Sequence, residues 1–522
     1  MIKNSIKKVK IPILLFLFIN SILTLVTAMF PYYNEKLVDE AILKDHSDFL
    51  KLGVAYLLTV VLCLLFSYFC NILQWKTGIG FEKTVKLKLF EKILSLKKTN
   101  FREKKVGDYI SIQSNDVTTL EQDYLNPFIT LLASIIAVII NAVIIVLVVD
   151  YRIAIIILLL SIVSIWLPEM LEDKLAKARK KYSSSQEKYT NWIKEMFDAH
   201  DLVNNDTYQN FLNEHERNLK KTSSDRYEFG KKKSFAMVVN GGGFYLINMA
   251  VFIVSGIMYL NNMISAGQIL AAFGYVECFC TPFEQILYCR TSMSATREII
   301  EKVEGINAQR IVLKDSHIDN YNKLVLENLS ITNGEFKIED LNYEFEAGKK
   351  YVIIGESGTG KTSILRAISG DITYEGKISL DSRIMDSDDR SDIMFFVQQE
   401  DHVFSDNFIK NITLYGSYEY DKRISYSGKH IDHISKMEDC TLLSGGEKKL
   451  IAFLRGELSK KRILLLDEPF SSTDSELTDS LQNILLQMSG ITVILVTHNY
   501  NIGLEKFDHI LELKNGELNN VK

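Results

Sequence analysis

The stretch Tyr351-Val-Ile-Ile-Gly355-Glu-Ser-Gly-Thr-Gly-Lys361-Thr362 decides the fold of the C-terminal part of this chain. Four apolar residues, typical of a short buried strand, lead into the pattern G-x-x-x-x-G-K-[ST], and a helical stretch follows over 363–369. Such a loop turns backbone N–H groups around phosphate oxygens, and the helix start adds partial positive charge. The flanking strand and helix argue against a chance glycine-rich turn. The residues predicted to surround the phosphates are Gly355, Glu356, Ser357, Gly358, Thr359, Gly360, Lys361, Thr362 and Ser363.

A second motif supplies two carboxylates. Residues 463–466 are a run of Ile and Leu that predicts a buried strand, and the strand ends in Asp467 and Glu468. We expect Asp467 and the Thr362 hydroxyl to hold Mg²⁺, which prefers oxygen ligands. Lys361 is expected to reach the β- and γ-phosphates, and Glu468 to orient or deprotonate an attacking water. Two solvated acids that cap a strand are the alternative, and the order of the two motifs argues against it.

Two further motifs complete a set. Leu443-Ser-Gly-Gly-Glu447 opens a helical stretch over 448–458, and Val496-Thr-His498 ends an apolar run that begins at Thr492. Neither is specific alone. Together with the phosphate loop and the Asp–Glu pair, they resemble the nucleotide-binding domain of ABC transporters, from about Leu324 to the C-terminus. The rest of the chain resembles, more loosely, the membrane domain of exporter-type half-transporters, which fuse one membrane domain to one nucleotide-binding domain.

The resemblance implies ATP and Mg²⁺ as cofactors, and it implies roles for further residues. The signature turn would cap the γ-phosphate that is bound on the other subunit, and Glu447 stands in it where many members have Gln. Gln399 would sense Mg²⁺ and water, with Gln398 as a neighbouring alternative. His498 would contact the γ-phosphate. The residues that gain a role in this way are Gln399, Ser444, Gly445, Gly446, Glu447, Asp474 (the acid of the D-loop, 471–474) and His498.

A composite site of this kind needs two nucleotide-binding domains, and one chain supplies only one. The resemblance therefore implies a dimer. The complete set of hydrolytic residues (Lys361, Asp467, Glu468 and His498) favours a homodimer with two equivalent sites. A heterodimer with a related half-transporter stays open.

Two features depart from the family pattern. Members usually stack adenine on an aromatic residue upstream of the phosphate loop, and the nearest matching place here is Ile331-Thr-Asn333, with Phe336 and Tyr343 off register. The stretch from Gln399 to Ser444 is also short, so the helical subdomain that docks on the membrane domain must be trimmed. Neither departure touches the predicted hydrolytic residues.

Composition sets the class of the whole chain. The 522 residues are 47% hydrophobic, and the net charge of −5 argues against a nucleic-acid binder. The mean hydropathy of +0.05 is the average of two unlike halves. Apolar stretches long enough to approach the roughly 20 residues of a membrane span occur only in the N-terminal half. They lie at about 11–30, 52–74, 127–149, 151–168, 235–260 and 268–290.

The predicted fold is therefore a multi-domain membrane protein. An all-α transmembrane domain with six helices occupies 1–305, a linker 306–323, and an α/β P-loop ATPase domain 324–522. The loops around 76–105 and 174–233 are rich in Lys and Arg, which accumulate on the cytoplasmic side of a membrane. We thus expect both termini in the cytoplasm of a bacterial cell, with the spans in the cytoplasmic membrane. The tips of the basic loops, around 107–115 and 204–212, resemble coupling helices; a solvated charge run is the alternative.

The predicted function is ATP-driven efflux of a peptide or an amphiphilic small molecule by this half-transporter. The alternatives are an importer on the exporter fold and a non-transporting regulatory ABC protein. The cargo is unknown: Glu277, in the middle of the sixth stretch, is a candidate contact for a cationic cargo, as is Glu284, or else each serves helix packing. Asn141, Asn240 and Asn248 are expected to join helices, and the six cysteines to act as small apolar residues.

Overall fold

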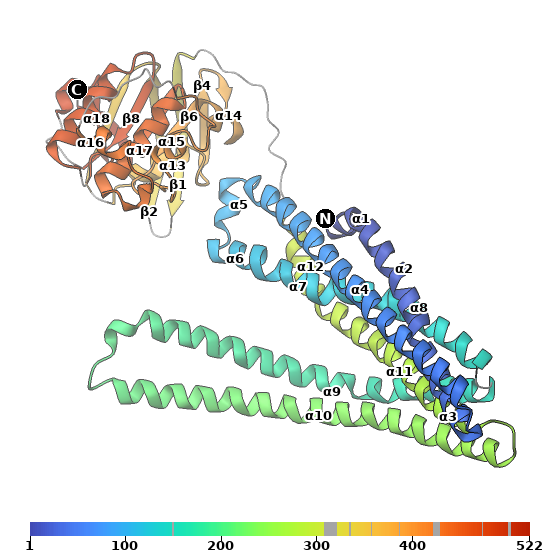
Figure 1. Ribbon diagram of the computed structural model, residues 1–522. Helices are drawn as coiled ribbons and strands as arrows, with labels where there is room; N and C mark the ends of the chain where they lie inside the picture. The colour runs from blue at the N-terminus through green and yellow to red at the C-terminus, as the bar shows by residue number, and fades with distance from the viewer. Residues whose placement is uncertain are drawn as a thin grey trace. The chain divides into compact units, whose positions relative to one another are not determined.

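The computed structural model describes residues 1–148, 151–306, 321–333, 336–356, 358–385, 387–420, 429–471, 473–498 and 503–521. The chain divides into two compact units (Figure 1). The helical unit consists of Met1–Leu94 and Val106–Asn307, and the C-terminal unit of Ser95–Lys105 and Ala308–Lys522. Most of the predicted linker, 307–320, lies outside the described residues, so the predicted domain boundaries stay predictions.

Each of the six predicted apolar stretches falls largely within a long helix. These are α2 (Lys10–Thr27) with α3 (Met29–Leu43), α4 (His46–Leu94), α8 (Asn126–Val148), α9 (Tyr151–Asp198), α10 (Tyr208–Leu260) and α11 (Ala266–Ala295). Among the described residues, four helical stretches are long and apolar enough to cross a membrane: Lys10–Leu43, His46–Leu94, Val106–Val148 and Tyr208–Leu260. For α9, the side chains of 161–173 are not described; α11 carries Glu277, Glu284 and Arg290.

The helices are much longer than the apolar stretches that marked them. With 49 residues in α4 and 53 in α10, a rise of about 1.5 Å per residue gives each a length of roughly 75–80 Å. A hydrocarbon core is only about 30 Å thick. The polar parts of these helices must therefore continue beyond any membrane that the apolar parts span, as the long basic loops predict.

Polar contacts fix the packing inside the helical unit. Asn141 of α8 donates its Nδ2 to the Cys278 carbonyl of α11 at 2.8 Å, and the buried Tyr275 hydroxyl donates to the Ala28 carbonyl at 3.0 Å. Asn141 thus joins two helices as predicted, whereas Asn248 donates to Phe244 of its own helix at 3.1 Å. The side chain of Asn240 lies outside the described residues. α9 and α10 run side by side as a hairpin (Figure 1). All six cysteines are free thiols.

The start of α11 is tied to the end of α3. Ser265 caps α11 in a reciprocal capping box with Gln268, and its hydroxyl also donates to Asp39 Oδ2 at 2.8 Å. Asp39 Oδ1 accepts the Gly267 N–H at 2.9 Å. A Cβ on Gly267 would lie 2.3 Å from the Glu35 carbonyl oxygen, so this close approach of two helices requires glycine.

The C-terminal unit is built on two sheets. Its strands are β1 (Lys323–Asn333), β2 (Phe336–Glu346), β3 (Lys350–Ile354), β4 (Glu375–Leu380), β5 (Arg383–Ile384), β6 (Met394–Val397), β7 (Ile463–Asp467), β8 (Thr492–Val496), β9 (His509–Lys514) and β10 (Glu517–Asn520). The antiparallel sheet has the order β2-β1-β4-β5, and the larger sheet the order β10-β9-β3-β8-β7-β6. In the larger sheet, every neighbouring pair of strands is parallel except β9 and β10, which are antiparallel.

Two hydrophobic cores lie on opposite faces of the larger sheet. Tyr351 and Ile353 of β3 join one core with β1, β2, β4 and α13 (Lys361–Ile368), while Val352 and Ile354 join the other with α17 (Gly445–Leu458) and α18 (Ser475–Gln487). Successive side chains of a strand point to opposite faces, so a continuous apolar run such as 351–354 fills both. The strands predicted at 351–354, 463–467 and 492–496 and the helix predicted at 448–458 are confirmed.

One piece of a basic loop belongs to the C-terminal unit. The short helix α5 (Lys98–Arg102) is held there by Asp371, whose side chain is fully buried. Lys98 Nζ lies 2.8 Å from Asp371 Oδ1, and Arg102 donates to the Asp371 carbonyl at 2.8 Å and to its carboxylate at 3.2 Å. Residues 107–115, predicted to resemble a coupling helix, form helices of the helical unit, and their contact with a nucleotide-binding domain stays a prediction.

The stretch predicted to form a trimmed helical subdomain contains little helix among the described residues. Between Gln399 and Ser444 the described residues form two α-helices of five and six residues, α15 (Phe408–Ile412) and α16 (Lys429–Ile434), and one 3-10 turn. Residues 421–428 lie outside the described residues.

Candidate active site

Three adjacent strands end at the same edge of the larger sheet and place the predicted hydrolytic residues there. β3 leads to the phosphate loop, β7 ends in Asp467 and Glu468, and β8 leads to Thr497 and His498. Because the order is β3-β8-β7 and all three are parallel, their carboxyl ends lie next to one another. Ligands of open parallel sheets bind at this edge.

The phosphate loop has the backbone that its glycines predict. Gly360 is the N-cap of α13 with φ +94°, and a Cβ on Gly355 would lie 2.9 Å from the Leu513 carbonyl oxygen. The Lys361 ammonium is turned back over the loop and donates to the carbonyls of Gly355 and Glu356 at 2.8 and 2.7 Å. Burial lowers the pKa of Lys361, while the nearby Glu468 and Asp467 oppose that shift. Ser357 lies outside the described residues.

Asp467 and Thr362 form the oxygen pair expected for a magnesium site. The Thr362 hydroxyl donates to Asp467 Oδ1 at 2.9 Å, and Asp467 is almost fully buried. Burial raises the pKa of Asp467, and the hydrogen bond from Thr362 opposes that shift. A carboxylate and a hydroxyl in contact at the start of a phosphate-binding helix are hard donors of the type that Mg²⁺ uses, so these residues fit the metal.

Glu468 and His498 are in direct contact. His498 Nδ1 lies 2.7 Å from Glu468 Oε1, and the His498 side chain is 61% exposed while that of Glu468 is 11% exposed. The Glu468 backbone has φ +52°, in the left-handed region, and its N–H donates to the Val496 carbonyl at 3.0 Å. The structure thus brings a shielded carboxylate and an accessible imidazole to the same edge as the phosphate loop.

The signature segment forms the start of α17. Ser444 is the N-cap, its hydroxyl accepts the Glu447 N–H at 3.3 Å, and Glu447 Oε2 accepts the Ser444 N–H at 3.0 Å. The second carboxylate oxygen of Glu447 is 2.9 Å from His433 Nδ1. Burial raises the pKa of Glu447, but the hydrogen bonds from Ser444 and His433 outweigh it, so the net shift is downward. Gly445 is exposed and Gly446 is buried.

The other predicted residues lie on connecting segments. Gln398 and the exposed Gln399 follow β6, whose last residue, Val397, pairs with Leu466 of β7, so both glutamines stay candidates. Asp474 is the N-cap of α18 and accepts the Leu477 N–H at 2.8 Å. At the expected adenine position, Ile331 is buried in the core, and the side chain of Phe336 lies outside the described residues.

Sequence reasoning missed two residues near this edge. Lys449, in the first turns of α17, donates to the Glu468 carbonyl at 2.6 Å and also contacts the Ser471 hydroxyl. Asp401 is largely buried with its Oδ2 unpartnered among the described residues, and burial raises its pKa to about 6. Neither residue belongs to a motif that fixes its place, because the surroundings of both depend on how α17 packs on the larger sheet.

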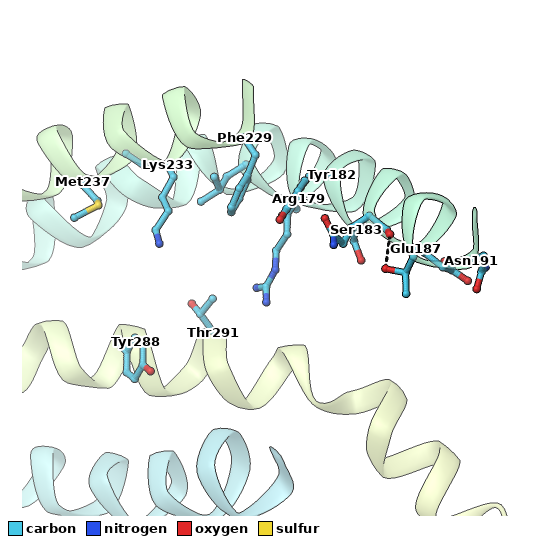
Figure 2. A pocket seen from close by; sticks show the side chains of 15 residues that line it. Arg179, Tyr182, Ser183, Glu187, Asn191, Phe229, Lys233, Met237, Tyr288 and Thr291 are labelled. Carbon is cyan, nitrogen blue, oxygen red and sulfur yellow. Dashed lines mark hydrogen bonds between the residues drawn. The ribbon is translucent and has the colours of Figure 1, made fainter. Parts of the chain in front are cut away.

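A second candidate site lies in the helical unit. A cavity of about 1100 Å³ separates α9 and α10 from α11 (Figure 2). Figure 2 shows the side chains of Arg179 and Lys233 projecting into it, opposite Tyr288 and Thr291 of α11. The rest of its wall is partly apolar, with Leu175, Ala176, Tyr182, Phe229, Ala236 and Met237, and partly polar, with Ser183, Gln186, Glu187, Thr190 and Asn191. Glu277 and Glu284, the predicted cargo contacts, are not among its lining residues; both are exposed.

Comparison with known proteins gives the same two regions. The ABC transporter transmembrane region matches residues 13–283, and the ABC transporter family matches residues 338–471. The microcin-J25 export ATP-binding/permease protein McjD of Escherichia coli is 24% identical over 552 aligned residues, covering 96% of this chain and 91% of its own length. The mesentericin-Y105 transport/processing ATP-binding protein MesD of Leuconostoc mesenteroides is 24% identical over 52% of this chain and 41% of its own length.

A solved structure shares the fold. The structure of a bacterial Atm1-family ABC exporter with ATP bound superimposes with a TM-score of 0.73 at 16% identity, and the match covers 98% of this chain and 94% of the other. The predicted fold class, helical transmembrane region and then α/β nucleotide-binding domain, is confirmed. The matches support ATP binding, ATP hydrolysis coupled to transport, and ATP-driven export by a multi-pass membrane protein. The chain belongs to the ABC transporter family and carries the family's transmembrane region and ATP-binding domain in one polypeptide.

Proposed function

We propose that this protein exports a peptide or an amphiphilic small molecule across the bacterial cytoplasmic membrane, with ATP hydrolysed between two nucleotide-binding domains. The observation that carries the proposal is the convergence of Lys361, Thr362, Asp467, Glu468 and His498 on the ends of three adjacent strands. Two relatives are named for microcin J25 and mesentericin Y105, which favours a peptide cargo.

The residues of this edge divide the hydrolytic work. Lys361 leaves the loop carbonyls for the β- and γ-phosphates of ATP, because an ammonium gains more from anionic oxygens than from neutral carbonyls. Thr362 and Asp467, with Gln399 or Gln398, would hold Mg²⁺, which neutralises charge on the phosphates when bound. Glu468 orients or deprotonates the attacking water, and His498 contacts the γ-phosphate from the exposed side.

A second subunit completes each site. Ser444, Gly445 and Gly446 of one chain cap the γ-phosphate that is held by the phosphate loop of the other, where the backbone N–H groups at the start of α17 favour an anion. The complete hydrolytic set in this chain supports a second copy of itself as the partner. Both termini, and the ATP sites with them, lie in the cytoplasm, as the basic loops predict.

The cavity of the helical unit is the candidate cargo site. Its wall combines a long apolar surface with two cationic side chains, Arg179 and Lys233, for which no partner is found among the described residues. Glu187 is the one acid among the lining residues that the structure describes, so the charged groups of the wall are positive on balance. A volume of about 1100 Å³ suits a ligand above ordinary drug size. The chemistry of the wall favours a cargo with an apolar or aromatic body and at least one carboxylate.

Transport into inverted membrane vesicles tests the function. The full-length protein is reconstituted, and short fluorescent peptides with a free C-terminal carboxylate are offered with ATP outside. Export corresponds to ATP-dependent accumulation inside these vesicles, absent with a non-hydrolysable ATP analogue. Accumulation only in right-side-out vesicles with ATP enclosed would identify an importer. ATPase activity that no peptide, lipid or dye alters, without transport in either orientation, would identify a regulatory protein.

A further inference from the structure

The backbone of the proposed catalytic glutamate is fastened to the signature helix by one side chain. Lys449 lies on α17, five residues after the N-cap Ser444, and its Nζ donates to the Glu468 carbonyl at 2.6 Å. The same ammonium contacts the Ser471 hydroxyl, and Ser471 in turn donates its N–H and its hydroxyl to the Glu468 carbonyl, each at 3.1 Å. One carbonyl oxygen therefore collects three donors, of which Lys449 alone is charged.

The Glu468 carbonyl belongs to a residue whose backbone conformation is rare for a non-glycine residue. Glu468 is a non-glycine residue with φ +52°, and it is the turn between the end of β7 and the segment that leads through Ser471 to Asp474. Its N–H is held by Val496 of β8 at 3.0 Å. Left-handed backbone at a residue with a Cβ persists only when its surroundings hold it. The N–H side is fixed by the sheet, and the carbonyl side is fixed by Lys449 and Ser471.

The electrostatic surroundings hold the ammonium in place. Lys449 is half-buried, and Glu468, Asp401 and Asp467 all act on its charge. Burial lowers the pKa of Lys449, while these three carboxylates oppose the shift. Its neighbour Lys448, on the same helix, forms no hydrogen bond with Glu468 or Ser471 among the described residues and is a matched reference.

We propose that Lys449 is a positioning residue for hydrolysis: it sets the Glu468 carboxylate in its working place and ties that place to the position of the signature helix. The inference rests on the proposed function. In a dimer, the signature start of this helix serves the ATP on the partner, while Lys449 holds the glutamate that serves the chain's own ATP. The contact then makes hydrolysis at one site respond to capture of ATP at the other.

Steady-state ATPase activity of the reconstituted full-length protein tests this role. Lys449→Met should lower kcat by roughly 10- to 100-fold, with KM for ATP within about twofold of wild type, because a misplaced group costs rate rather than binding. Lys449→Arg keeps a charged donor, so its decrease in log kcat should be at most half of the decrease seen in Lys449→Met. The ATP dependence of the wild-type rate should be sigmoidal, and that of Lys449→Met hyperbolic. Lys448→Met should match wild type in all three readouts.

The outcomes separate this inference from the function beneath it. An unchanged kcat in Lys449→Met, an equal rise in KM, or an arginine variant no better than the methionine variant would each overturn the positioning role. A merely structural role would lower the melting temperature and kcat together, and the arginine variant, which disturbs packing more, would not rescue. If Lys449→Met is lost from the membrane, Lys449→Gln against Lys449→Arg gives the same comparison. Wild-type turnover in Glu468→Gln would instead defeat the proposed function itself.

Discussion

The C-terminal unit and the helical unit present their functions in opposite ways. In the C-terminal unit, a few side chains meet within hydrogen-bond distance: Thr362 with Asp467 at 2.9 Å and Glu468 with His498 at 2.7 Å. In the helical unit, the candidate cargo site is a cavity of about 1100 Å³, with two cationic groups and one acid among apolar and polar side chains. Chemistry on one invariant group, a triphosphate, demands fixed distances, whereas a cargo cavity needs only volume and charge of the right kind.

This difference predicts in which of the two units a single substitution has a large effect on activity. At the sheet edge, each side chain has its own role in hydrolysis, and no neighbouring residue can take over that role when the side chain is removed. In the cavity, several groups share the binding, so each contributes a modest amount. The two regions should therefore differ both in the size of the effect and in the kinetic constant that changes.

Glu468→Gln is the variant expected to have the largest effect. A general base contributes about 10²- to 10⁴-fold to rate, and glutamine keeps the shape but cannot take a proton. We expect kcat for ATP to fall by that factor while ATP still binds, measured by phosphate release and by binding of a fluorescent ATP analogue. The exposed Glu517 of β10 is the control, and Glu517→Gln should behave as wild type. Near-wild-type turnover in Glu468→Gln would break the assignment of chemistry to this edge.

The same contrast explains what could be predicted from sequence. The phosphate loop could be recognised from the sequence because its backbone requires glycine at fixed positions. Gly360 has φ +94°, and a side chain on Gly355 would approach Leu513 too closely. The strands 463–467 and 492–496 could be predicted equally well, because a strand that is buried on both faces of a sheet needs an unbroken run of apolar residues. Strict local requirements on backbone conformation and burial therefore produce sequence patterns that can be recognised.

Contacts between distant segments left no such pattern. Lys449 reaches Glu468 across 19 residues, and Arg102 reaches Asp371 across 269, so no spacing rule could reveal either. In the helical unit, an apolar stretch marks only the part of a helix suited to lipid. In α4 and α10, polar residues continue the helix beyond the apolar stretch. The cavity lies between α9, α10 and α11, and its position depends on how these three helices pack.

Arg179→Ala tests the cargo cavity and should have a smaller effect. A hydrogen bond to a charged group is worth about 1.5–3 kcal/mol, which corresponds to roughly a tenfold or larger rise in the cargo concentration for half-maximal ATPase stimulation. The probes are one aromatic peptide with a free C-terminal carboxylate and its amidated form. Basal ATPase activity should stay unchanged. Lys180→Ala removes a charge one position along α9, off the cavity wall, and is the matched control.

The two probes also discriminate the charge of the cargo. The carboxylate form should stimulate wild type better than the amide, and Arg179→Ala should erase that preference. If a cationic peptide is preferred instead, and Glu277→Gln abolishes the preference, the exposed acid of α11 is the cargo contact and the cavity assignment fails.

Glu447→Gln should change the affinity for ATP by a smaller factor. Its carboxylate sits at the start of the signature helix, where the partner's triphosphate is proposed to bind, and its lowered pKa keeps it charged at neutral pH. Two negative charges within about 8 Å at a protein surface repel by up to roughly 2 kcal/mol. Glutamine preserves the capping box, so KM for ATP should fall about two- to tenfold with little change in kcat. Glu438→Gln, an exposed acid outside the capping box, should leave KM unchanged; a raised KM in Glu447→Gln would contradict the placement.

The smallest expected effect concerns stability rather than rate. Burial raises the pKa of Asp401 to about 6, against hydrogen bonding from Gln398 and the charges of Arg455 and Lys449. The folded state thus holds this proton more tightly than the unfolded chain, whose Asp titrates near 3.9. Below pH 4 the group is neutral in both states and costs nothing, whereas above pH 6 its ionised form destabilises the fold. Asp401→Asn should therefore raise the melting temperature at pH 8 by a few degrees, and the gain should shrink toward pH 5.

A neighbouring acid supplies the opposite sign. Asp406 is hydrogen-bonded by Lys410, which lowers its pKa, so its charge stabilises the fold above the unfolded pKa and that contribution fades only as the pH falls. Asp406→Asn should lower the melting temperature slightly at pH 8 and change it little between pH 8 and pH 5. Differential scanning fluorimetry on the detergent-solubilised protein at both pH values measures the pair. If the two asparagine variants shift in the same direction at pH 8, burial is not what governs Asp401, and the sheet edge is more open to water than its sharp geometry implies.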